Sequence, residues 1–193
     1  MNFYRFFVGN WQILLFAILL TLFSGFGQTF LLSLYIPSFI DALKINHTYY
    51  STIYSSATLL SGISIIFAGK QIDRLPLRSF TFATIIGIAT ANIVAGFSFN
   101  PISLFVAIYL LRFFGQGMLS HTAMTAMGRF FNKARGKALS IAYLGFPIAE
   151  GLFPIIFVFL IAAVGWRYSF FISAISILIF LLPTTYVLLK AFS

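Results

Sequence analysis

Two ionisable residues, Arg112 and Glu150, stand inside long apolar stretches of the chain. A charge at the middle of a membrane-spanning helix costs about 2.5–3.5 kcal/mol on insertion scales, so such a residue is expected to have a partner or a function. Counted at about 1.5 Å per residue from the flanking Arg129 and Lys137, Arg112 lies about 25 Å deep and Glu150 about 20 Å deep. We therefore expect the two side chains to pair directly or through a bound substrate. The alternative is a buried ion pair that only fixes helix register.

Other polar residues are expected to extend this site for substrate binding or coupling. Residues four apart share a helix face, so Gln116 is expected beside Arg112. Helical spacing also predicts that Tyr143 lies on the face of Glu150. Gln28 belongs to a polar stripe that either lines a cavity or makes interhelical hydrogen bonds, as Ser, Thr and Gln do in membranes. The stripe comprises Thr21, Ser24, Gln28 and Tyr35.

The composition indicates the environment in which these residues work. Of 193 residues, 61% are hydrophobic and 8% are charged, whereas soluble domains average about 45–50% apolar and about 25% charged residues. A water-soluble globular fold is therefore excluded. Disorder is excluded too, because 26 Phe, 9 Tyr and 2 Trp carry too much apolar surface to remain solvated.

Six apolar stretches are each long enough to cross a bilayer, which takes about 20 residues. They cover about 11–40, 49–68, 80–98, 102–128, 138–164 and 168–189. None shows the alternation of a barrel strand. We expect an all-α membrane protein whose six transmembrane helices form a single domain, 1–193. A cleaved signal peptide over 11–23 is the alternative for the start, but the apolar run continues through Ile40 and is too long for one.

Lysine and arginine are distributed unequally between the loops, and cytoplasmic loops carry the excess of these residues. Lys44 and Arg167 lie on one side. The other side, which holds both termini, carries Arg5, Lys70, Arg74, Arg78, Arg129, Lys133, Arg135, Lys137 and Lys190. Both termini are therefore expected in the cytoplasm. Because this bias accounts for most of the +9 net charge, no nucleic-acid partner is implied.

The chemistry of an enzyme is not expected. There is no cysteine, and no phosphate loop, nucleotide motif or metal-ligand cluster occurs, so neither cofactor nor metal is implied. Ser98 and His121 could suggest an intramembrane serine protease, whose serine and histidine must lie within about 2.6–3.2 Å. Their depths in the membrane differ too much for that contact. His121 points about 180° away from Arg112, and we expect it to make a helix–helix contact.

The loop from Gly69 to Arg78, GKQIDRLPLR, resembles the signature G-x-x-x-D-R-x-x-x-R between the second and third helices of the major facilitator superfamily. Further motifs resemble those of the same superfamily in the expected order. They are Leu111–Gly117 in the fourth helix, Arg135–Ala138 before the fifth, Gly145–Pro147 within it and Gly165–Arg167 before the sixth.

The resemblance assigns roles to individual residues. It implies a cytoplasmic gate formed by Gly69, Asp73, Arg74 and Arg78. For the arginines the alternative is positive-inside anchoring, which does not explain Asp73. Arg112 would be the fourth-helix arginine, which serves substrate binding or proton coupling. Gly145 and Pro147 would bend the fifth helix, since proline lacks a donor and clashes one turn back.

At the level of the whole chain, the resemblance implies the amino-terminal six-helix half of a transporter, built as a 3+3 inverted repeat. Such a protein moves a small solute, with or without a coupled proton, by rocking against a second six-helix half or a second copy. Monocarboxylate-transporter-like members are the nearest group with assigned substrates, which suggests an organic anion on Arg112. The expected location is a bacterial inner membrane. The alternative is a truncated, non-transporting half or a membrane scaffold.

Overall fold

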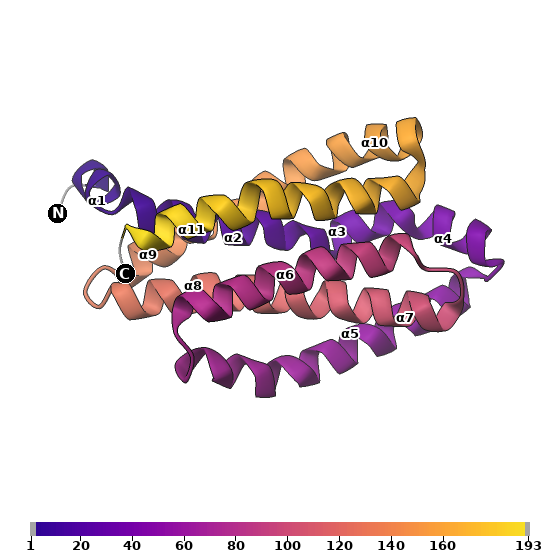
Figure 1. Ribbon diagram of the computed structural model, residues 1–193, viewed down its shortest axis with the longest axis horizontal. Helices are drawn as coiled ribbons and strands as arrows, with labels where there is room; N and C mark the ends of the chain where they lie inside the picture. Colours follow the sequence, from indigo (N-terminus) through magenta and orange to yellow (C-terminus); the bar gives the residue numbers. More distant parts are fainter. Residues whose placement is uncertain (1–2, 192–193) are drawn as a thin grey trace.

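The computed structural model describes residues 3–191, with every side chain in that range except those of residues 3–5 and 73. This part of the chain is helical throughout most of its length and contains no strand. The helices lie side by side in an elongated bundle, and α1 (Phe3–Gly9) lies at the same end as the last residues of α11 (Leu182–Lys190) (Figure 1). The predicted all-α fold is confirmed.

In the part of the chain that the structure describes, five helical stretches are long and apolar enough to span a membrane: Trp11–Leu43, His47–Ile72, Leu77–Gly96, Pro101–Phe130 and Arg135–Lys190. The last stretch reverses direction at Gly165, whose backbone has φ 82° and ψ 161°. Glycine adopts such a conformation readily because it has no Cβ. The reversal divides this stretch into two antiparallel segments (Figure 1), which correspond to the fifth and sixth apolar stretches of the sequence.

The first stretch is an interrupted helix. It runs through α2 (Trp11–Phe23), a 3₁₀ segment (Ser24–Gly27), α3 (Thr29–Leu32), a 3₁₀ turn (Ser33–Tyr35) and α4 (Ile36–Leu43). Gln28 separates the first two parts from the rest, with φ −82° and ψ 152° in the extended region. The Gln28 N–H still donates to the carbonyl of Gly25 and its own carbonyl accepts from Leu32, so the change of backbone direction is confined to this residue.

The remaining helices are longer and mostly regular. They are α5 (His47–Gly69), a 3₁₀ turn (Lys70–Asp73), α6 (Leu77–Gly96), α7 (Pro101–Leu110), α8 (Ser120–Phe130), α9 (Arg135–Ala142) and α10 (Gly145–Ser176). Asparagine side chains cap two of them: Asn46 accepts from the backbone N–H of Tyr49, and Asn100 forms a capping box with Ser103. Each cap satisfies N–H groups that a helix start leaves without a partner.

Two segments are wound as π-helix, Leu111–Leu119 between α7 and α8 and Ile177–Leu181 before α11. Runs of π-helix are rare and often mark functional sites. The first run contains Arg112 and packs against the interruption at Gly27. A Cβ added to Gly27 would overlap the backbone carbonyl of Leu111 and crowd the backbone of Gly115. Only glycine at this position lets the two irregular segments approach so closely.

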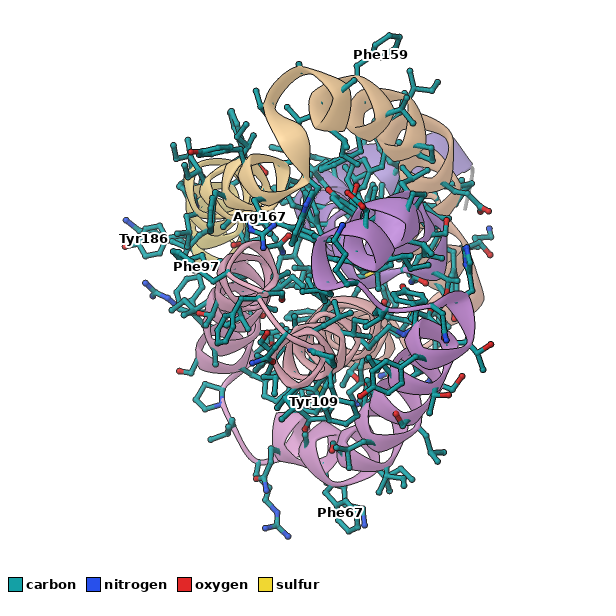
Figure 2. All side chains as sticks on the ribbon, turned by 90° about the vertical axis from the view of Figure 1, so that its right-hand side faces the viewer. Phe67, Phe97, Tyr109, Phe159, Arg167 and Tyr186 are labelled. Atoms are coloured by element: carbon teal, nitrogen blue, oxygen red, sulfur yellow. The ribbon has the colours of Figure 1, made fainter. Side chains whose placement is uncertain are left out.

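Burial is uneven around the bundle. Helix α6 is well covered, whereas α5 and α10 expose large apolar side chains along one side each. Phe67 of α5 and Phe159 of α10 point outward at opposite edges of the bundle, with 66% and 72% of their surface exposed (Figure 2). Such surfaces suit a lipid environment or another transmembrane segment.

Candidate functional site

The guanidinium of Arg112 lies inside the bundle, where 7% of the residue is exposed. Its Nη1 donates hydrogen bonds to the backbone carbonyl of Gly27, at 3.2 Å, and to the Thr29 hydroxyl, at 3.1 Å. The guanidinium carbon lies 5.5 Å from the ring centroid of Tyr54, a cation–π distance. Its Nε is buried and has no hydrogen-bond partner. The interruption of the first helix thus supplies the acceptors for this buried cation.

The expected direct pair between Arg112 and Glu150 is wrong for this conformation. Among the side chains that the structure describes, the one ion pair joins Lys44 to Asp41, at 3.0 Å on the surface. The rise per residue predicts how deep Glu150 lies in the membrane, but not the direction in which its side chain points around the helix axis. Its neighbour Ala149 faces the bundle and is fully buried, which turns the Glu150 side chain outward to an exposed position.

Glu150 nevertheless lies near the same part of the first helix. It lines a surface cavity of about 500 Å³ together with Gln28, Thr29, Phe30 and Phe146. Gln28 and Glu150, both predicted site residues, are thus brought together. Thr29 also lines a second cavity, and its hydroxyl is hydrogen-bonded to Tyr54 and accepts from Arg112. The two predicted charges therefore both lie near Thr29 but form no ion pair with each other.

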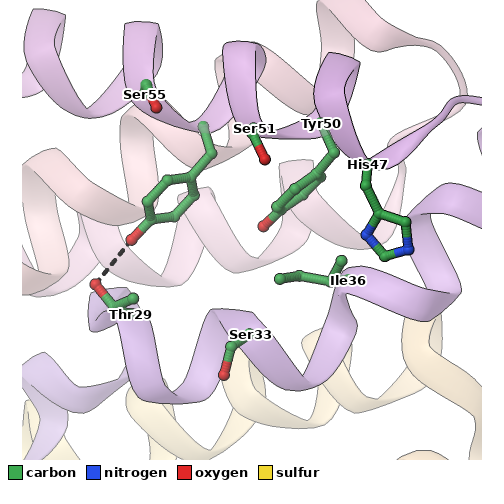
Figure 3. Close-up of a pocket in the computed structure, with 8 residues that line it drawn as sticks. Thr29, Ser33, Ile36, His47, Tyr50, Ser51 and Ser55 are labelled. Carbon is green, nitrogen blue, oxygen red and sulfur yellow. Dashed lines mark hydrogen bonds between the residues drawn. The ribbon is translucent and has the colours of Figure 1, made fainter.

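The second cavity, which we call the hydroxyl cavity, lies between the first helix and α5 and has a volume of about 240 Å³ (Figure 3). It is lined by Thr29, Ser33, Ile36, His47, Tyr50, Ser51, Tyr54 and Ser55. At the end nearest Arg112, which we call its inner end, the hydroxyls of Thr29 and Tyr54 are 2.8 Å apart and hydrogen-bonded. Sequence reasoning missed this cavity. The signal for it was the pair of four-residue repeats in α5, which place two tyrosines and two serines along one side.

Gln116 and Tyr143 line neither of these two cavities. Gln116 is on the π segment with Arg112, and its side-chain oxygen is buried without a partner, as is the Ser120 hydroxyl. Tyr143 lines a third cavity, of about 450 Å³, whose walls include His121 and Arg135, and Glu150 does not line it. Tyr143 and Glu150 therefore line different cavities instead of sharing one helix face, because the helix is interrupted between α9 and α10.

That interruption lies just before the predicted bend at Gly145 and Pro147. Helix α9 ends at Ala142 and α10 begins at Gly145, so Pro147 falls in the first turn of a new helix, where its missing N–H costs little. A Cβ on Gly145 would overlap the Thr21 hydroxyl, so glycine permits close packing of α10 on α2. Thr21 donates to the free carbonyl of Ala142 at 2.6 Å.

The loop with the predicted gate residues is tied to neighbouring helices. The Nε2 of His121 lies 3.3 Å from the carbonyl oxygen of Gly69, which confirms the expected helix–helix contact. The guanidinium of Arg78 lies 4.6 Å from the ring centroid of Tyr186 in α11. Arg74 is exposed. The side chain of Asp73 lies outside the described residues.

A polytopic helical bundle with a buried arginine at a broken helix is the architecture of a membrane transport protein. Residues 17–191 match the family model of the Major Facilitator Superfamily, so the chain belongs to this superfamily. It is an integral membrane protein of a transporter family. The chain has no significant match among curated proteins. In the described part of the chain, no group of three or more His, Cys, Asp or Glu could hold a metal ion.

Proposed function

We propose that this chain is one half of a secondary transporter that carries small organic anions by alternating access. The observation that carries the proposal is the state of Arg112: a buried guanidinium with an unpartnered Nε and, among the described side chains, no carboxylate within ion-pair distance. A buried charge without a counter-ion is costly, and an anionic substrate would supply that counter-ion. A guanidinium binds a carboxylate with two parallel hydrogen bonds.

Glu150 is proposed to carry the coupled proton. Its carboxyl group is exposed on the side of the bundle where Thr29 and Gln28 also lie, and it is not tied up in an ion pair with any described side chain. A carboxyl group in this position can exchange a proton with either side of the membrane when the transporter changes conformation. Binding of the anion to Arg112 and protonation of Glu150 would be linked through the segment Gln28–Thr29 that separates them.

A second six-helix half, or a second copy of this chain, is proposed to cover this side. Glu150 and the hydroxyl-bearing side of α5, with Thr48, Thr52 and Ser56, are exposed. Polar groups in the hydrocarbon region face protein or a water-filled cavity rather than lipid. The loop with Gly69, Asp73, Arg74 and Arg78 would gate the cytoplasmic end. Both termini would lie in the cytoplasm of a bacterial inner membrane.

Uptake of radiolabelled pyruvate, succinate and gluconate into proteoliposomes that contain the purified chain tests the proposal. We expect at least one of these anions to accumulate, and Arg112→Lys to lower its uptake about tenfold because an ammonium lacks the planar fork. The matched control is Lys133→Arg, which exchanges the same two cations at an exposed loop position. Equal uptake by the wild type and Arg112→Lys would remove the anion-binding role. Absence of any uptake would exclude a transporter built from two copies of this chain, and would leave a separate second half or the alternative, a non-transporting half or scaffold.

A further inference from the structure

We infer that the hydroxyl cavity binds a polyhydroxylated carboxylate, such as a sugar acid, with its hydroxyl groups against α5 and its carboxylate toward Arg112. The inference rests on the proposed function, in which the guanidinium takes an anion, and it specifies which class of anion. It also places the ligand between the first helix and α5, in a cavity that the sequence motifs do not indicate.

The first observation is a set of polar groups that face this cavity and have no partner. Tyr50 is 4% exposed, yet its hydroxyl makes no hydrogen bond with any described residue. The hydroxyls of Ser51 and Ser55 and the ring of His47 also have no hydrogen-bond partner in the described part of the chain. Tyr50, Ser51 and His47 extend from α5 toward the first helix (Figure 3). Tyr50 is a buried residue and Ser51, Ser55 and His47 are exposed ones, and all four present polar groups that a ligand with its own hydroxyl groups can hydrogen-bond.

The second observation is the charge at the inner end. Thr29 and Tyr54 close the cavity there, and the guanidinium of Arg112 lies directly behind them, hydrogen-bonded to Thr29 and over the Tyr54 ring. No Asp or Glu lines the cavity. The inner end therefore favours a negative charge, whereas the rest of the wall offers neutral donors and acceptors. A ligand that matches both has a carboxylate at one end and hydroxyls along its length.

The size of the cavity suits a small solute. Its volume of about 240 Å³ is below the range of about 300–1,000 Å³ typical of drug-sized ligands. An aliphatic carboxylate of the same length would fit the volume. However, it would leave the hydroxyls of Tyr50 and Ser51 unpaired, and sites built to hydrogen-bond a ligand discriminate strongly against analogues that lack those groups.

Equilibrium binding to the full chain in lipid nanodiscs, measured by isothermal titration calorimetry, tests the inference with three probes. D-gluconate has both features, hexanoate has the charge without hydroxyls, and sorbitol has hydroxyls without the charge. We expect gluconate to bind at least about tenfold more tightly than either of the others. Tyr50→Phe and Ser51→Ala should each weaken gluconate binding about tenfold and leave hexanoate binding unchanged.

The matched control variant is Tyr49→Phe, which removes a hydroxyl from the exposed neighbour that does not line the cavity. It should bind gluconate as the wild type does, and size-exclusion profiles should show that all variants remain folded. Equal affinity for gluconate and hexanoate, with both lost in Arg112→Lys, would overturn the inference and leave the anion proposal standing. Sorbitol binding as tightly as gluconate, or no carboxylate binding at all, would overturn both.

Discussion

The guanidinium of Arg112 donates a hydrogen bond to the backbone carbonyl of Gly27, a residue 85 positions away in the sequence, at a distance of 3.2 Å. This contact joins two irregular segments, the interruption of the first helix and the π segment of the fourth. The interruption frees the carbonyl that the arginine needs, and the arginine compensates the carbonyl that the interruption leaves without a helical partner. Each irregularity thus makes the other less costly.

Gly27→Ala should destabilise the protein by about 1–3 kcal/mol, the range found when methyl groups are forced into closely packed sites. The added Cβ would overlap the carbonyl of Leu111 and push the first and fourth helices apart. Unfolding of the purified chain by SDS titration, followed by circular dichroism, measures the change. Gly62→Ala is the control, because a Cβ there meets no atom within 4 Å. Similar losses in both variants would contradict the close approach.

Thr21→Val should cost about 1–3 kcal/mol, because it leaves the carbonyl of Ala142 buried without a partner at the interruption between α9 and α10. The substitution keeps the shape of the side chain and removes its hydroxyl donor. The same unfolding assay applies. Thr52→Val provides the comparison, since the Thr52 hydroxyl is exposed and bonds only within its own helix. If Thr21→Val were as stable as the wild type, the hydrogen bond across the interruption would not contribute to the free energy of unfolding.

Glu150→Gln should abolish the stimulation of anion uptake by a pH gradient while anion exchange without a gradient continues. Glutamine has nearly the same shape and cannot take up a proton. Uptake and counterflow in proteoliposomes with imposed inside and outside pH values separate the two activities. Glu150→Asp keeps a titratable group and should retain the stimulation. Full gradient-driven uptake by Glu150→Gln would rule out this residue as the proton carrier.

Single cysteines should reveal the orientation, because the chain has none of its own. We expect a membrane-impermeant maleimide added to intact cells to label Phe99→Cys and not Lys133→Cys, since the basic loops are expected in the cytoplasm. Both positions are exposed. Permeabilised cells, in which both cysteines should react, provide the control. Labelling of Lys133→Cys alone in intact cells would reverse the assigned topology.

Much of the architecture could be predicted from composition and local pattern. A run of apolar residues has to be helical in hydrocarbon, because every backbone N–H and C=O must find a partner within the segment. Its length then limits the number of crossings. Arg112 could also be identified from the sequence, because a charge within a membrane-spanning helix is costly whichever neighbours that helix packs against. The contact of His121 with another helix also followed from helical spacing.

Only the tertiary structure decided what Arg112 contacts. Rise per residue places Arg112 and Glu150 at similar depths, but their contact depends on rotation about two helix axes, on the π segment and on the interruption before Gly145. These irregularities arise from packing between segments distant in the chain. The hydroxyl cavity depends on them in the same way, since its two walls belong to different helices. Local sequence therefore determined which residues enter the membrane, and long-range packing determined which of them meet.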